Sequence, residues 1–195
     1  MNMHRSAQRG TAIFFTGLSG AGKTSISNAL NEYIQRRGDR TVTMLDGDVV
    51  RGVLTPELGF SREHRDLNVL RIAYVASEVT KHGGIAICAQ IAPYAGTREK
   101  ARDMVTRYGS FVEVYVATPI EICEARDPKG LYAKARAGLM KAFTGIDDPY
   151  EQPVHAEIVL DTRNSTPEEC AQTIADWLME AGILSKLESG LSRGG

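Results

Sequence analysis

The feature that most constrains this chain is a glycine-rich segment that lies between an apolar run and an amphipathic helix pattern. Residues 17–24, Gly-Leu-Ser-Gly-Ala-Gly-Lys-Thr, match G-x-x-x-x-G-K-[ST] at every fixed position. Residues 12–15 are apolar and predict a buried strand, and apolar residues then recur at helical spacing at Ile26, Ala29, Leu30, Tyr33 and Ile34. A strand before the glycines and a helix after them disfavour the alternative, a glycine-rich turn that matches by chance.

This segment predicts a phosphate-binding loop. Its glycines permit a tight turn whose N–H groups, with the positive end of the helix dipole, hold phosphate oxygens. We expect Lys23 to lie exposed where the loop meets the helix and to reach the β- and γ-phosphates of ATP, and we expect the Thr24 hydroxyl to ligate Mg²⁺. The ATP-binding residues expected from the loop are Gly17, Ser19, Gly20, Ala21, Gly22, Lys23, Thr24 and Ser25.

Composition disfavours several other classes of function. The chain has 195 residues and a net charge of −1, so we expect no basic field that would attract a nucleic acid or an anionic membrane. It has no apolar run near the ~20 residues of a membrane-spanning helix, and residues 1–10 are polar, unlike a signal peptide. The three cysteines form no C-x-x-C motif, which favours buried or spare thiols in a reducing cytoplasm over a metal site or disulfides.

Strand and helix patterns alternate along the chain. Strands are predicted at 12–15, 41–45, 85–89, 111–116 and 158–160. Helices are predicted after Thr24, from Ser61 to about His82, from about Thr97 to Tyr108, and after capping-box signatures at Thr118 and Thr166. This alternation predicts an α/β fold of P-loop NTPase type, a three-layer sandwich in which helices cover both faces of a parallel sheet.

The same pattern predicts where the domain and its site lie. We expect one domain over residues 11–183, a polar N-terminal tail before it and a flexible C-terminal tail over 184–195. Residues 126–150 carry turn residues without clean periodicity, which favours a lid over a surface excursion without a role. Ligands of such folds bind at the carboxyl ends of the strands, so the P-loop, residues 46–51 and residues 90–94 should meet at one rim.

Two carboxylates follow the second predicted strand. No acidic residue ends the third strand, where many P-loop proteins place an aspartate linked to Mg²⁺, and Asp46 or Asp48 is the natural substitute. One of them could act on the metal and the other could take a proton from an attacking hydroxyl. The alternative is an Asx turn after the strand. We therefore expect Lys23, Asp46 and Asp48 to be catalytic, and Thr24 and Asp46 to hold the metal.

A second group of residues could bind an anionic acceptor. Arg51, Arg65 and Arg71 lie near Asn68 in the sequence, and Arg65 and Asn68 share one face of the predicted helix. An arginine can hold a sulfate or phosphate through two parallel hydrogen bonds, whereas the alternative for each arginine taken singly is a solvated surface charge.

Two aromatic residues, Phe60 and Phe143, lie in predicted loops and not at periodic core positions. An exposed loop aromatic can stack on a base. Each of the two rings could therefore be a stacking platform for the base of a ligand. The alternative is a minor core contact.

These residues belong to motifs by which the chain resembles the adenylylsulfate kinases, which phosphorylate the 3′-hydroxyl of adenosine 5′-phosphosulfate (APS). The resemblance runs from about Thr11 to Trp177. Its motifs are residues 17–24 (GLSGAGKT), 45–51 (LDGDVVR), 58–61 (LGFS), 92–94 (APY), 126–132 (RDPKGLY), 135–138 (ARAG) and 143–150 (FTGIDDPY).

The resemblance implies roles for individual residues. In such enzymes the residues matching Phe60 and Phe143 stack on the adenine of APS, and the region around Arg126 covers the adenine of ATP. The implied acceptor site consists of Asp48, Arg51, Phe60, Arg65, Asn68, Ile91, Ala92, Lys129 and Phe143. The resemblance also implies ATP and Mg²⁺ as cofactors, a homodimer, and a link or fusion to ATP sulfurylase. The alternatives are a P-loop kinase with another small-molecule acceptor and a regulatory domain that binds the sulfonucleotide without turnover.

Overall fold

The computed structural model describes residues 9–38 and 40–185. Its elements are β1 (Thr11–Thr16), α1 (Lys23–Arg37), β2 (Val42–Asp46), α2 (Gly47–Leu54), α3 (Arg62–Lys81), β3 (Ile85–Ala89), α4 (Ala95–Thr106), β4 (Ser110–Val116), α5 (Ile120–Arg126), α6 (Leu131–Arg136), β5 (Ile158–Leu160) and α7 (Pro167–Glu180). All five predicted strands are present, within one residue of the predicted boundaries.

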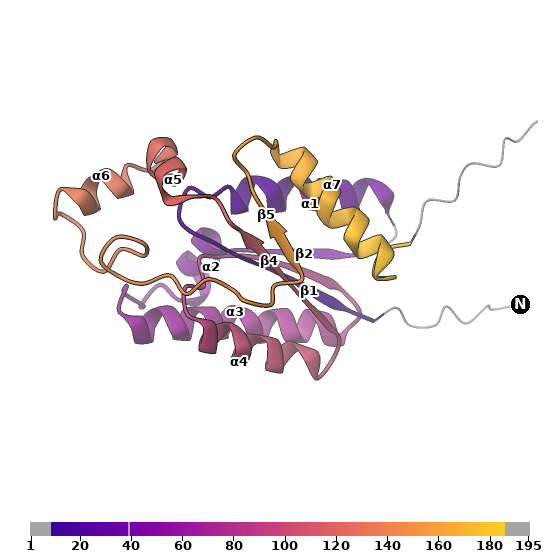
Figure 1. The fold of residues 1–195 in the computed structure, drawn as a ribbon. Helices are drawn as coiled ribbons and strands as arrows, with labels where there is room; N and C mark the ends of the chain where they lie inside the picture. Colours follow the sequence, from indigo (N-terminus) through magenta and orange to yellow (C-terminus); the bar gives the residue numbers. More distant parts are fainter. Residues whose placement is uncertain (1–8, 39, 186–195) are drawn as a thin grey trace, which may run out of the picture.

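The strands form one sheet in the order β2-β3-β1-β4-β5, and every neighbouring pair is parallel. In Figure 1, α1 and α7 lie on one side of this sheet, and α3 and α4 lie on the other. The predicted three-layer α/β fold is therefore confirmed. Because β1 lies at the centre of the order, the loop that follows it opens in the middle of the carboxyl edge of the sheet.

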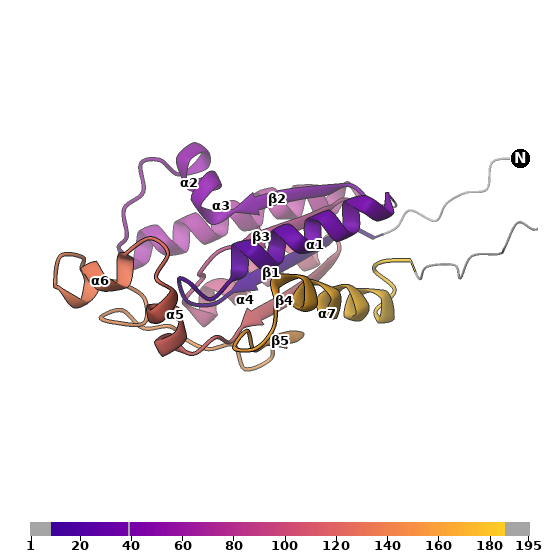
Figure 2. The ribbon, with the colours of Figure 1, turned by 90° about the horizontal axis from the view of Figure 1, so that it is seen from above.

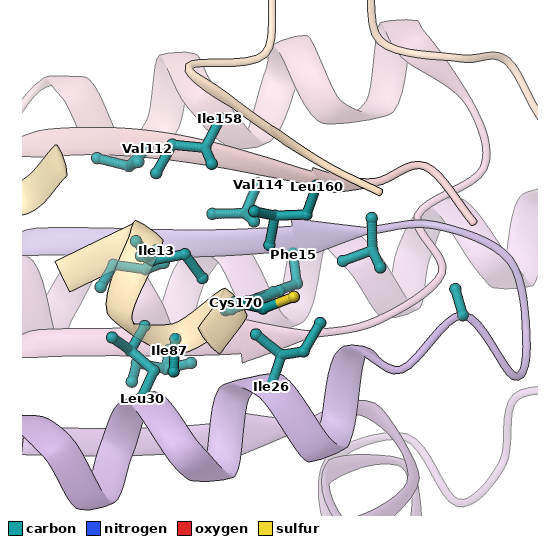
Figure 3. Packing of buried hydrophobic residues seen from close by; sticks show 14 of the residues in the cluster. Ile13, Phe15, Ile26, Leu30, Ile87, Val112, Val114, Ile158, Leu160 and Cys170 are labelled. Atoms are coloured by element: carbon teal, nitrogen blue, oxygen red, sulfur yellow. The ribbon is translucent and has the colours of Figure 1, made fainter. Parts of the chain in front are cut away.

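Each face of the sheet has its own core because successive side chains of a strand point to opposite faces. Ile13 and Phe15 pack towards α1 and α7, where Figure 3 shows them beside Ile26 and Leu30. Phe14, between them in sequence, belongs to the core beneath α3 and α4. Strands buried on both faces explain the continuous apolar run in the sequence.

The helix signals have mixed outcomes. The Ser61 side chain caps α3, and Thr166 and Glu169 form a complete capping box at α7, as predicted. The expected capping box at Thr118 is wrong, because α5 begins at Ile120 without a side-chain cap. The Thr118 hydroxyl donates instead to the carbonyl oxygen of Ala21, at 2.9 Å, and so supports the P-loop.

Two short helices, α2 and α6, lie outside the sequence-based expectations. Asp46 begins α2 by accepting hydrogen bonds from the backbone N–H groups of the first turn. Helix α6 lies within residues 126–150, and Figures 1 and 2 show that α5 and α6 lie beyond the carboxyl ends of the strands. The predicted lid region therefore has a helix of its own and lies over the predicted rim.

The structure also bears on the tails and on the cysteines. Leu184 is buried against α7, within the stretch predicted as a flexible tail, and residues 1–8 and 186–195 lie outside the described part of the chain. All three cysteines are buried free thiols, as predicted. None of the described helices combines the length and hydrophobicity needed to cross a bilayer.

Candidate active site

The P-loop folds as its glycines require. Gly17, Gly20 and Gly22 all have positive φ, and Gly22 precedes the first turn of α1. A Cβ atom on Gly17 would lie 2.7 Å from the carbonyl oxygen of Val116, so a larger residue cannot occupy this position without moving β4. The loop thus passes close to the neighbouring strand and leads directly into the amino end of a 15-residue helix.

Lys23 is buried, not exposed as expected. Only 9% of it is accessible, and its Nζ donates to the carbonyl oxygens of Gly17, at 2.9 Å, and Leu18, at 2.7 Å. Burial lowers the pKa of Lys23 to about 8, while Cys123, Asp48 and Asp46 act in the opposite direction. The ammonium group is held inside the loop, where phosphates would approach its N–H groups.

Thr24 and Asp46 lie together at the ends of two adjacent elements. The Thr24 hydroxyl donates to Oδ2 of Asp46 at 2.9 Å. The other oxygen, Oδ1, accepts from the backbone N–H of Asp48 at 3.0 Å, so the Asx-turn alternative is also realised at this residue. A hydroxyl and a carboxylate are hard oxygen ligands of the kind that Mg²⁺ prefers, so this pair fits the predicted metal site.

Asp48 is the second residue of α2 and forms an ion pair with Lys129 of the predicted lid region. Both side chains are more than half exposed. The contact joins the rim of the sheet to the lid across the site, and an anionic ligand could compete with Asp48 for Lys129.

Arg51 and Arg65 organise the loop between α2 and α3. Arg51 donates to the carbonyl oxygens of Leu58 and Gly59, and its guanidinium carbon lies 4.3 Å from the centre of the Phe60 ring. Burial, followed by the nearby charge of Arg65, lowers the pKa of Arg51. Burial and mutual repulsion both destabilise these two positive charges, and a bound anion would stabilise them. The pair therefore indicates an anion-binding site.

Arg65 also reaches the lid. Its guanidinium group donates to the carbonyl oxygens of Phe60 and Ala142 and to the Thr144 hydroxyl. The next member of the predicted group, Asn68, is buried and accepts a hydrogen bond from Thr55 at 2.7 Å.

The predicted position of Arg71 in this group is wrong. Arg71 pairs with Glu57 on the outer side of α3 and does not line the central cavity.

The two phenylalanines differ in burial. Phe60 is 62% exposed, whereas Phe143 is only 7% exposed and packs edge-on against Tyr132, with ring centres 4.9 Å apart. The expectation that Phe143 lies outside the core is therefore wrong. The hydroxyl of Tyr132 donates to the carbonyl oxygen of Ser19 at 3.0 Å, so Phe143 is linked to the P-loop through one side chain.

Arg126 contacts the P-loop, where its Nη1 donates to the carbonyl oxygens of Gly20 and Ala21 at 3.5 Å. It donates to the carbonyl oxygen of Thr162 at 2.9 Å and to the Thr162 hydroxyl at 3.1 Å. Thr162, Ser165 and Pro167 follow β5 and line the cavity, and the sequence analysis did not identify them. The position of a polar segment just after the fifth strand is the signal that could have found them.

One cavity of about 740 Å³ connects these groups. Every site residue predicted from the sequence lines it, except Gly17 and Ala21 of the P-loop and Arg71 of α3. Its lining includes the P-loop with Arg126, which contacts the loop backbone at Gly20 and Ala21, and Arg51 with Phe60, which contact each other. Its lining also includes Gln90, which the sequence analysis placed at the rim without a role.

Comparisons with known proteins agree with this arrangement. The sequence profile of the family described as adenylylsulphate kinase matches residues 9–161. The chain is 49% identical over 177 residues to an adenylyl-sulfate kinase of Synechococcus sp. (strain JA-3-3Ab), covering 91% of this chain and 98% of the relative. It is 48% identical over 180 residues to a sulfate adenylyltransferase of Phaeosphaeria nodorum, of which it spans only 31%.

The fold agrees as well. A solved structure of the Mycobacterium tuberculosis APS kinase in complex with AMPPNP and APS superposes with a TM-score of 0.83 at 40% identity, over 87% of this chain and 98% of that one. A family profile that covers most of the chain, and relatives of this identity along nearly their whole length, lead to one conclusion: the chain belongs to the adenylylsulphate kinase family.

Proposed function

We propose that this protein transfers the γ-phosphoryl group of ATP to the 3′-hydroxyl of adenosine 5′-phosphosulfate. The observation that carries the proposal is the cavity of about 740 Å³ whose lining contains both the P-loop and a cluster of arginines with an exposed aromatic ring. Asp46 contacts Thr24 of the P-loop, and Asp48 is close enough to interact electrostatically with both Lys23 and Arg51. Two nucleotides bound in such a cavity would meet at the carboxylates.

Lys23 supplies the positive charge for the transfer. In the described conformation its Nζ donates to two loop carbonyl oxygens, and phosphate oxygens would replace them as partners. Phosphoryl transfer depends mainly on positioning and on stabilisation of the charge on the moving group. A lysine held within the loop costs little reorganisation when ATP binds.

The different contacts of Asp46 and Asp48 suggest different roles for the two aspartates. Both oxygens of Asp46 are engaged, one by Thr24 and one by the backbone N–H of Asp48. In the described part of the chain, Lys129 is the one side chain that contacts the Asp48 carboxylate. A sulfonucleotide that recruits Lys129 would free Asp48 to accept the proton of the attacking hydroxyl. We therefore assign the proton to Asp48 and the metal to Thr24 and Asp46.

Mg²⁺, when bound, would supply Lewis-acid stabilisation of the phosphate oxygens. Thr24 and Asp46 would hold it, because their oxygens already lie 2.9 Å apart. The chain's own part is to keep that pair oriented, which Asp46 does as the N-cap of α2. We also expect a homodimer in the cytoplasm, and sedimentation at several protein concentrations tests the dimer.

A coupled assay of ADP release tests the proposed reaction. ATP and Mg²⁺ are supplied with APS, with AMP, which lacks the sulfate, or with no acceptor. We expect ADP release only in the reaction that contains APS. Mass spectrometry and nuclear magnetic resonance of the product should then place the new phosphate on the 3′-oxygen. Release at the same rate with every acceptor, or binding of APS without release, would contradict the proposal. The second outcome would support a regulatory binding domain.

A further inference from the structure

The side chain of Arg98 contacts two parts of the acceptor half without lining the cavity. Arg98 lies on α4 and is 4% exposed, and its Nε forms an ion pair with Glu113 of β4 at 2.8 Å. A buried ion pair is weak grounds for a gain in stability, because desolvation offsets the attraction between the charges. The ion pair alone therefore does not explain why an arginine is buried here, and the partners of its other N–H groups must be considered.

Those donors bind two backbone carbonyl oxygens beside the site. Nη1 donates to Ala92 at 2.8 Å, and Nη2 donates to Glu151 at 2.7 Å. Ala92 belongs to the cavity-lining turn after β3 and has a φ of 43°, which is rare for a residue other than glycine. Glu151 follows the last residue of the lid. One rigid guanidinium plane thus fixes the acceptor turn relative to the end of the lid.

Other contacts tie the same turn to the P-loop strand. The hydroxyl of Thr16, the last residue of β1, donates to the carbonyl oxygen of Ile91 at 2.7 Å and lies 2.8 Å from the hydroxyl of Tyr150. The backbone N–H of Glu151 donates to the carbonyl oxygen of Pro93 at 2.8 Å. The turn is therefore held from three sides, by β1, by α4 and by the end of the lid.

We infer that Arg98 is a positioning residue for the acceptor nucleotide. It holds the strained turn at residues 91–93 and the end of the lid in the relative position that forms the acceptor half of the cavity. The P-loop has supports of its own, because Thr118 and Thr162 donate to the carbonyl oxygen of Ala21, and we therefore expect the ATP half to depend less on Arg98 than the acceptor half does. This inference rests on the proposed function for the identity of the acceptor.

Arg102 provides a matched control on the same helix. It also forms an ion pair with Glu113, at 3.5 Å, and with Glu157, at 2.6 Å, but no hydrogen bond described for it reaches a cavity-lining segment. Arg98→Met and Arg102→Met therefore make the same change of charge near the same carboxylate. Only Arg98→Met removes donors from Ala92 and Glu151.

We expect Arg98→Met to raise KM for APS and lower kcat, together by about 10- to 100-fold in kcat/KM, because small misplacements of a reactant have effects of this size. The dissociation constant of a non-hydrolysable ATP analogue should change less than about twofold in the same variant. Arg102→Met should leave both ligands near wild type. Equal effects of the two variants, or parallel losses of both ligands, would overturn the inference.

Two further measurements test the role of Arg98 separately. One distinguishes it from a general loss of stability, and the other does not depend on the identity of the acceptor. The double variant Arg98→Met/Glu113→Gln removes the unpaired buried charge, and the loss for APS should persist when its melting temperature recovers. Hydrogen exchange of the Glu151 amide in the protein without ligands should accelerate in Arg98→Met and not in Arg102→Met. Unchanged exchange would overturn the inference even if APS proves not to be the acceptor.

Discussion

Phe60→Ala is expected to weaken APS binding while the fold and the ATP site stay intact. Phe60 lies in the loop between α2 and α3, and 62% of it is exposed. Its principal contact is the Arg51 guanidinium group, 4.3 Å from the ring centre. Because the ring is mostly uncovered in the protein alone, its removal deletes little packing, and the missing area is the area that a base would cover.

The magnitude follows from that exposed area. An aromatic side chain buries about 150–250 Å² when fully covered, so the exposed part of Phe60 offers roughly 90–150 Å² to a ligand. A base stacked on one face covers about half of this, which at ~25 cal/mol/Å² gives about 1–2 kcal/mol. This range agrees with stacking energies of about 1–3 kcal/mol per base, and it corresponds to roughly a 5- to 30-fold rise in Kd.

Isothermal titration of APS and of an ATP analogue into Phe60→Ala, with a melting curve for each protein, tests the reasoning. Phe143→Ala is the matched comparison, because Phe143 lines the same cavity but is 7% exposed. We expect Phe143→Ala to lower the melting temperature and to weaken both ligands, since Phe143 packs on the tyrosine that binds the P-loop.

Unchanged APS affinity in Phe60→Ala would refute the stacking role of the exposed ring. A Phe143→Ala variant that loses APS affinity alone, with an unchanged melting temperature, would refute the argument from burial. That result would favour the simple two-sided clamp that the sequence suggests.

Four further predictions follow from the site. Lys23→Ala should lower kcat by at least about 100-fold with an unchanged circular dichroism spectrum, and a variant near the wild-type rate would remove the P-loop lysine from the mechanism. Because the pKa of Lys23 is about 8 without ligand and phosphate should raise it, ATP affinity should fall as pH rises through about 8; an equal Kd at pH 7 and pH 9.5 would contradict this. Thr24→Val should raise the Mg²⁺ concentration for half-maximal rate, and an unchanged Mg²⁺ dependence would argue against this ligand. Gln90→Met should raise the free energy of unfolding by about 1 kcal/mol in urea titrations, because neither polar atom of that buried amide has a partner among the described residues, whereas a loss of stability would point to an unseen partner.

The fold class, the buried strand before the glycines and the phosphate loop could all be predicted from the sequence. These features depend on short-range physics: apolar runs that must be buried, helical periodicity, and glycines at backbone angles that other residues avoid. The placement of Asp46 beside Thr24 could also be predicted, because the carboxyl ends of parallel strands share one edge. The contact between them, at 2.9 Å, fits that prediction.

The burial of Lys23 and Phe143 and the contacts of Arg98 could be seen only in the tertiary structure. Each depends on groups far away in sequence: Phe143 on Tyr132 and the loop behind it, and Arg98 on Ala92, Glu113 and Glu151. An arginine on a polar helix has the same local pattern whether it faces water or a carboxylate of a neighbouring strand. Long-range packing resolves that ambiguity, because it fixes which polar groups lose water and must find partners within the protein.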